Sequence, residues 1–93
     1  MSDPPAAIVV TLYTKPGCHL CEPVAATIEA ASRLRRFDFV RRNILDDPAE
    51  FDRYKHAIPV VAVNGREVAR YRLNLNDLLA AIDVAAAGPG GKS

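Results

Sequence analysis

A short, nearly unbroken run of apolar and β-branched residues lies near the start of the chain, at positions 8–13. The run is rich in β-branched side chains, which is typical of a strand buried on both faces in a parallel-type sheet. Lys15-Pro16-Gly17 ends it, because proline and glycine interrupt regular structure. Beyond this break, apolar residues recur at spacings of three and four and predict the inner face of a helix: Leu20, Val24, Ile28, Ala31 and Leu34.

The middle of the chain predicts a second strand and a short helix. Residues 37–44 are strand-like but mixed in polarity, so this strand is expected near an edge of the sheet. Asp46-Asp47-Pro48 is a helix start, since an acidic cap is followed by a proline that fits the first turn. The helix that follows presents Phe51 and Tyr54 on one side.

A hairpin and a last helix are predicted for the final third. Residues 59–63 and 67–72 flank Asn64-Gly65, a dipeptide that strongly favours the tight turn of a β-hairpin. Asn74 or Asn76 caps the last helix. The inner stripe of that helix consists of Leu75, Leu78, Leu79 and Ile82.

The order of elements predicts one α/β domain over residues 7–87. It is a βαβ unit followed by αββα, which gives a four-stranded mixed sheet with helices on both faces. Residues 1–6, with two prolines, and residues 88–93, which begin with Gly-Pro-Gly-Gly, are expected to be flexible tails. With 93 residues the chain has room for one modest core.

Composition and charge narrow the class of protein. The chain is 49% hydrophobic and 25% charged, with a formal net charge of +1, so neither nucleic acid nor an anionic membrane is expected as a partner. The first seven residues, MSDPPAA, lack the positive charge and long apolar run of a secretory signal. No stretch approaches the ~20 apolar residues that span a bilayer. We therefore expect a cytoplasmic monomer.

The only two cysteines, Cys18 and Cys21, are three residues apart. Structural disulfides are rare in the cytoplasm, so the pair is expected to serve chemistry. If Cys18 opens a helix, unpaired backbone N–H groups and the helix dipole favour its thiolate. Cys18 would then attack a substrate disulfide, and the less exposed Cys21 would resolve the mixed disulfide. Pro23 leaves two alternatives, a kinked helix or a helix that begins near Cys21, and the second weakens the dipole effect on Cys18.

His19 lies between the cysteines and has two interpretations. An imidazolium beside Cys18 would further stabilise the thiolate, whereas a solvent-facing spacer would have no role in the chemistry. Leu20 is expected to make the first core contact of the helix.

The segments "LYTKPGCHLC" and "AIPVVAVNGREV" together make the chain resemble the glutaredoxin branch of the thioredoxin superfamily, and especially small bacterial glutaredoxin-like proteins. The resemblance spans residues 8–84 and implies a thioredoxin-like fold. It implies that Pro59 is cis beside the sulfurs, and that Ile58 offers its backbone to a substrate peptide or to glutathione. It also implies that Lys15 assists the thiolate and binds a glutathione carboxylate.

The chain departs from both branches of that superfamily at named positions. Leu73 and Asn74 stand where glutaredoxins carry a Gly-Gly pair, although Asp77 keeps an acidic residue at the glutathione-binding helix. Gly17 and Leu12 stand where thioredoxins carry a tryptophan and a buried aspartate. The chain is therefore more similar to a glutaredoxin than to a thioredoxin.

The function expected from these residues is a thiol–disulfide oxidoreductase that reduces protein or glutathione mixed disulfides through Cys18 and Cys21. We expect no bound cofactor and no metal, with glutathione as a candidate co-substrate and either glutathione or a flavin reductase as the electron donor. Two cysteines supply only half of a four-ligand zinc site. The alternatives are a thioredoxin-fold binding module or a metal or iron–sulfur carrier, each with little turnover.

Overall fold

The structure, a computed structural model, describes residues 8–87. Both predicted tails, together with residue 7 of the predicted domain, lie outside the described residues. The elements follow the predicted order, with one additional 3₁₀ turn, η1. They are β1 (Val9–Thr14), α1 (Cys21–Ser32), β2 (Asp38–Asn43), η1 (Ile44–Asp46), α2 (Pro48–Tyr54), β3 (Val60–Val63), β4 (Arg66–Arg70) and α3 (Leu75–Ala87).

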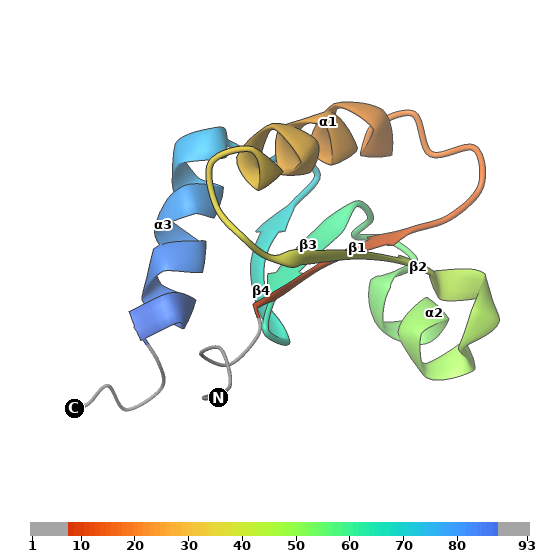
Figure 1. The fold of residues 1–93 in the computed structure, drawn as a ribbon. Coiled ribbons are helices and arrows are strands. Elements are labelled where there is room, and N and C mark those ends of the chain that lie inside the picture. Colours follow the sequence, from red (N-terminus) through yellow and green to blue (C-terminus); the bar gives the residue numbers. More distant parts are fainter. Residues whose placement is uncertain (1–7, 88–93) are drawn as a thin grey trace.

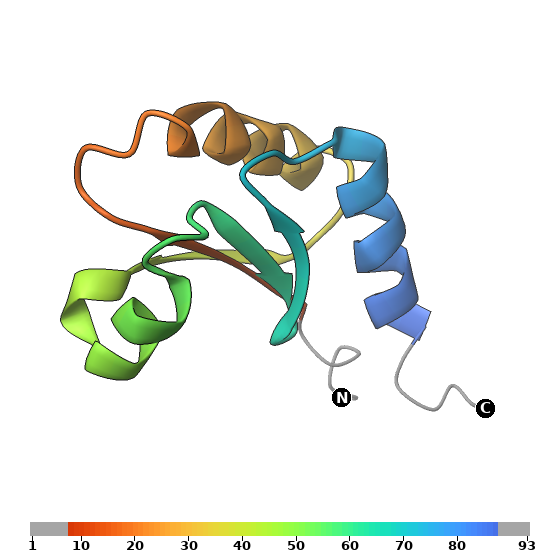
Figure 2. The same ribbon diagram turned by 180° about the vertical axis from the view of Figure 1, so that it is seen from behind.

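The four strands form one mixed sheet in the order β2-β1-β3-β4. β1 runs parallel to β2 and antiparallel to β3, and β3 pairs with β4 as a hairpin. The mixed-polarity strand β2 lies at an edge, as its sequence predicts. α1 and α3 lie on one side of the sheet and α2 on the other (Figure 1, and Figure 2 from behind). The predicted α/β architecture with helices on both faces is confirmed.

Side chains alternate along β1, so that each face of the sheet has its own core. Val10 and Leu12 are fully buried on the face covered by α1 and α3, where Ile28 and Ile82 pack against them. Burial of an aliphatic side chain of this size contributes about 1.5–3 kcal/mol. Tyr13 points to the opposite face. There it joins a smaller cluster formed by Ile44, Tyr54, Ala57 and Val60.

The β3–β4 turn has the geometry that its sequence predicts. Asn64 and Gly65 have positive φ angles of 51° and 83°, the pattern of a type I′ turn. The turn is also attached to β1, since the backbone N–H of Val9 donates to Asn64 Oδ1 at 2.8 Å and the backbone N–H of Asn64 donates to the Val9 carbonyl at 2.8 Å. Both hydrogen bonds fix the hairpin against the central strand.

α1 begins at Cys21, which is the second of the two alternatives left open by Pro23. Pro23 is therefore in the first turn, where its missing N–H has no intrahelical acceptor to leave unsatisfied. The predicted core contact of Leu20 is wrong, because Leu20 precedes the helix and is 56% exposed. Leu34 is also exposed, since the helix ends at Ser32 before the apolar stripe is complete.

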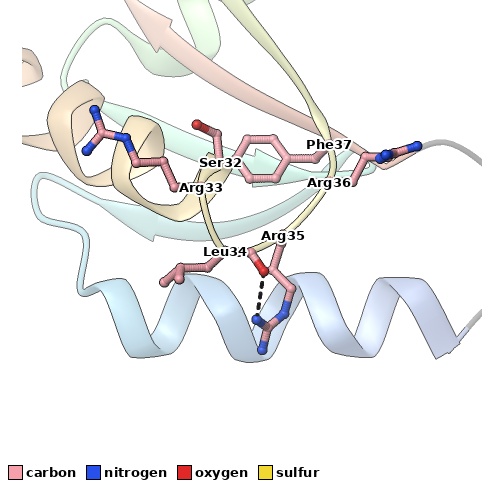
Figure 3. Close-up of a pocket in the computed structure, with 6 residues that line it drawn as sticks. All are labelled: Ser32, Arg33, Leu34, Arg35, Arg36 and Phe37. Atoms are coloured by element: carbon pink, nitrogen blue, oxygen red, sulfur yellow. Dashed lines mark hydrogen bonds between the residues drawn. The ribbon is translucent and has the colours of Figure 1, made fainter.

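The chain leaves α1 through an exposed, arginine-rich segment at residues 33–37. It borders an open cavity of about 380 Å³, shown in Figure 3. Arg35 donates from Nε and Nη2 to the two carboxylate oxygens of Asp83 on α3, at 2.7 and 3.0 Å. This ion pair lowers the pKa of Asp83 through the hydrogen bond and the charge of Arg35. It ties the end of α1 to α3.

Among the helices within residues 8–87, none combines the length and the hydrophobicity that crossing a membrane requires.

Candidate active site

A tight turn carries the chain from β1 to the first cysteine. The backbone N–H of Cys18 donates to the Lys15 carbonyl at 3.3 Å, with Pro16 and Gly17 as the two central residues. Gly17 has a φ of 82°. Proline at the first central position and a positive φ at the second are the features of a type II turn. The sequence Lys-Pro-Gly-Cys thus builds the turn that holds Cys18 at the end of the sheet.

The two cysteines form a disulfide, with Cα atoms 5.4 Å apart. The predicted pairing is confirmed, and so is the predicted difference in exposure. Cys21 is only 6% exposed, whereas Cys18 is half-buried. Cys21 is the first residue of α1, and Cys18 lies three residues before the helix begins.

The position of Cys18 outside α1 changes the electrostatic picture. The backbone N–H groups of Cys21 and Glu22 already donate to the carbonyls of Cys18 and His19, both at 3.3 Å. They do not point at the sulfur of Cys18 as unpaired donors. Cys18 therefore lies outside the helix, as the second alternative for Pro23 allowed, and direct stabilisation of its thiolate by first-turn N–H groups has no support.

A cavity of about 270 Å³ lies beside the disulfide. Its lining combines the end of β1, the turn, the first residues of α1 and the outer strand β2. The residues are Thr14, Lys15, Pro16, Gly17, Cys18, Cys21, Glu22, Arg41 and Asn43. The predicted binding residue Lys15 thus shares a cavity with both sulfurs, and Arg41 adds a second positive charge.

Arg41 was not foreseen as a site residue. It reaches the cavity because β2 runs parallel to β1 with Arg41 opposite Leu12, which places its side chain on the face covered by α1. Its guanidinium stacks 5.3 Å from the centre of the Phe39 ring, and Nη2 is 3.8 Å from Glu29. The sequence could not place Arg41 on this face, because the alternation of side chains along β2 assigns faces only when the register with β1 is known.

The Ile58–Pro59 peptide bond is cis, as the resemblance implied. Tyr13 is opposite Val60 in the β1–β3 register, so Pro59 is next to the end of β1 that carries the cysteine turn. Pro59 is buried and Ile58 is half-buried. Ile58 lies outside the strand register, and none of the loop and turn hydrogen bonds in residues 8–87 uses its backbone N–H or C=O.

Tyr71 fixes this second loop from both sides. Its backbone N–H donates to the Pro59 carbonyl at 2.8 Å, and its hydroxyl donates to the His56 carbonyl at 2.7 Å. Tyr71 has a φ of 68°, a left-handed conformation that is unfavourable for a bulky residue. Both hydrogen bonds stabilise the loop in which Tyr71 has this conformation. The sequence placed Tyr71 in the predicted second hairpin strand, residues 67–72, whereas β4 ends at Arg70.

The other two predicted binding residues lie apart from the cavity lining. His19 is exposed in the turn between the cysteines. Asp77 is exposed in the first turn of α3, where its backbone N–H donates to Asn74 Oδ1 at 3.2 Å. Asn74, rather than Asn76, is thus the cap of α3. The structure leaves the roles of both residues as predictions.

Comparison with known proteins resolves the family. Residues 9–83, most of the chain, match the glutaredoxin-like domain family (DUF836). The chain belongs to this family. Among curated proteins, no sequence matches the chain.

Solved structures agree with the fold of a glutaredoxin-like domain. The solution structure of protein Ne2328 from Nitrosomonas europaea is 23% identical, with a TM-score of 0.72 over 87% of this chain and 98% of that one. The crystal structure of protein XcR50 from X. campestris is 30% identical, with a TM-score of 0.66 over 81% and 96%. A thioredoxin from Fasciola hepatica, 20% identical, has a TM-score of 0.59 over 84% and 80%. The domain thus has a thioredoxin-like fold with a Cys-x-x-Cys pair.

Proposed function

We propose that this glutaredoxin-like domain is a dithiol–disulfide oxidoreductase in which Cys18 and Cys21 alternate between thiol and disulfide forms. One observation carries the proposal, namely that the two sulfurs are joined while differing in exposure. A half-buried Cys18 can meet a substrate sulfur. A buried Cys21 is shielded from substrate and can attack the neighbouring Cys18 sulfur within the same molecule.

The reaction follows from that asymmetry. The Cys18 thiolate attacks one sulfur of a substrate disulfide, a new S–S bond forms, and the first substrate thiolate leaves with the electron pair. Cys21, after losing its proton to water, attacks the Cys18 sulfur of the mixed disulfide. The second substrate thiolate leaves, so the substrate gains two electrons and the protein retains the disulfide. A thiol donor returns the pair to the dithiol.

The surroundings of Cys18 favour an extended substrate with negative charge. Lys15 and Arg41 border the cavity beside the sulfurs, where Glu22 is the acidic residue of the lining and Glu29 lies 3.8 Å from Arg41. Ile58, at the same end of the sheet, offers backbone groups that could pair with a peptide strand. We propose that Lys15 and Ile58 contribute to substrate binding in this way, with Pro59 holding the Ile58 backbone in place.

The first turn of α3 bears on which electron donor reduces the disulfide. The resemblance implies glutathione contacts at this turn, yet Asn74 replaces a glycine and its side chain already accepts the N–H of Asp77. A glutathione carboxylate would have to displace the Asn74 side chain to reach that N–H. This favours a protein reductant, such as a flavin-dependent thioredoxin reductase system, over glutathione.

The test measures turnover of two substrates, a small mixed disulfide and insulin. For each substrate the electrons come either from glutathione with its reductase or from a thioredoxin reductase system. Cys18→Ser is expected to reduce turnover to the uncatalysed background. Cys21→Ser serves as the matched variant and is expected to accumulate the mixed disulfide on Cys18, detected by mass.

Two results would contradict the proposal. Full activity in Cys18→Ser would remove Cys18 from the mechanism. Absence of turnover with either electron source in the unmodified domain would instead favour the alternative of a binding module on the same fold. Metal analysis of protein purified without added metal tests the third candidate, a metal or iron–sulfur carrier, by its stoichiometry.

A further inference from the structure

Thr14 is the last residue of β1, and its side chain lies on the same face as the sulfurs. Val10 and Leu12 face α1, so the alternation of the strand directs Thr14 to that face as well. α1 begins directly above it, at Cys21. The Thr14 hydroxyl donates to Cys21 Sγ at 2.9 Å, and its second acceptor, the Lys15 carbonyl, is farther away at 3.4 Å.

Cys21 needs a donor of this kind if it is to act as a thiolate. It is 6% exposed, so water contributes little to stabilising a charge on its sulfur. Its own backbone N–H and that of Glu22 are occupied by the carbonyls of Cys18 and His19. Pro23, the next residue, has no N–H. Among the side chains of residues 8–87, Thr14 supplies the hydrogen bond to this sulfur.

We propose that Thr14 is a positioning residue whose hydroxyl stabilises and aims the thiolate of Cys21, a role that rests on the proposed function. During resolution, the Cys21 thiolate attacks the Cys18 sulfur, the S–S bond to the substrate breaks, and the electron pair leaves on the substrate sulfur. During recycling, a donor thiolate attacks Cys18 and Cys21 leaves as the thiolate. The Thr14 hydroxyl donates to the same sulfur in both directions.

The experiment uses the reduced domain and an aromatic disulfide, 5,5′-dithiobis(2-nitrobenzoate), which releases one coloured thiolate when Cys18 attacks and a second when Cys21 closes the ring. Thr14→Val removes the hydroxyl and keeps the shape, and Thr14→Ser keeps the hydroxyl. Loss of one hydrogen bond to a charged sulfur is expected to slow the second release by about tenfold or more in Thr14→Val. The first release should be unchanged, and Thr14→Ser should behave as the unmodified domain.

A pH profile separates this chemical role from a structural one. In Thr14→Val the rate of the second release should reach half its maximum at a higher pH, because less Cys21 is thiolate at any given pH. In Thr14→Ser this midpoint should be unchanged. The same shift should appear in the alkylation of Cys21 by iodoacetamide in a Cys18→Ser background, where no turnover takes place. Thr14→Ala provides a second variant without the hydroxyl should the valine form fail to fold.

The outcomes distinguish this inference from the proposed function. If the unmodified domain releases no second thiolate, the dithiol mechanism itself fails. If ring closure is normal and Thr14→Val matches the unmodified domain in rate and in pH midpoint, the role of Thr14 is overturned while the dithiol mechanism stands. A second release as slow in Thr14→Ser as in Thr14→Val would overturn it as well.

Discussion

Two loops meet at the same end of the central strands, and they are held in different ways. The cysteine loop, between β1 and α1, relies on contacts within itself, namely the local turn around Gly17, the hydrogen bond from Thr14 to Cys21 and the disulfide. The proline loop, before β3, is fixed from outside by two hydrogen bonds from Tyr71 and by burial of Ala57 and Pro59.

The difference matches what each loop has to do. A sulfur that exchanges partners must stay accessible and must move by a bond length or more as disulfides form and break. A backbone that receives a substrate strand works best when it is already in its bound conformation, since ordering on binding lowers affinity. Exposure in one loop and fixation in the other are therefore complementary.

Gly17→Ala should give the largest effect on the cysteine loop. At a φ of 82° an added Cβ meets no atom within 4 Å, so the cost arises from backbone conformation alone. Left-handed backbone at a non-glycine residue costs about 1–2 kcal/mol, which urea unfolding would measure. The reaction of Cys18 with a disulfide should also slow, because the turn positions it.

Gly65→Ala is the matched control for that change. Gly65 has a nearly identical φ of 83° and equally open space, but it lies in the β3–β4 turn. It should lose similar stability and leave the thiol reactions unchanged. If both variants slowed the chemistry equally, the cysteine turn would have no special role in positioning the sulfur.

Tyr71→Phe tests the proline loop and should have a smaller effect. It removes the hydroxyl donor to the His56 carbonyl while keeping the ring. Loss of one such hydrogen bond costs about 0.5–1.5 kcal/mol. We expect a higher KM for a peptide substrate with kcat nearly unchanged, since the loop would be less ordered before binding.

Tyr13→Phe provides the comparison on the neighbouring strand, because no side-chain hydrogen bond within residues 8–87 involves the Tyr13 hydroxyl. It should change stability less than Tyr71→Phe does. A fall in kcat without a change in KM in Tyr71→Phe would mean that the proline loop does not act through substrate binding.

Asp83→Asn should have the smallest effect, since it removes an exposed ion pair remote from both loops. Because the Arg35 hydrogen bond and charge lower the pKa of Asp83 below its ordinary value of 3.8, the pair stabilises the fold above that pH. Its contribution is lost as the pH falls through the lowered value. The difference in urea midpoint between the variant and the unmodified domain should therefore shrink below pH 3.8 and at high salt. A difference that grew on acidification would contradict this sign.

The sequence was informative wherever local chemistry determines structure. Asn64-Gly65 predicted the hairpin turn, the β-branched run predicted the central strand, and the three-residue spacing of Cys18 and Cys21 predicted that they can pair. The proline in the first turn left the start of α1 open between two positions. Local patterns decide such features because their energetics involve few residues.

What the sequence could not predict depends on tertiary register. Arg41 borders the cavity beside the sulfurs only through the parallel pairing of β2 with β1, and Tyr71 reaches His56 across 15 positions in the chain. Thr14 was part of the quoted motif, but its hydrogen bond to Cys21 depends on where α1 begins, which the sequence left open. Contacts between elements fixed these roles, and no single-residue signal encodes them.

The most direct test compares how fast each sulfur reacts. The fully reduced domain would be treated briefly with iodoacetamide at neutral pH, and the modified cysteines would be mapped by mass spectrometry over time. The difference in exposure between Cys18 and Cys21 predicts that Cys18 is alkylated well before Cys21. Equal rates, or faster modification of Cys21, would contradict the assignment of the attacking and resolving sulfurs on which the mechanism depends.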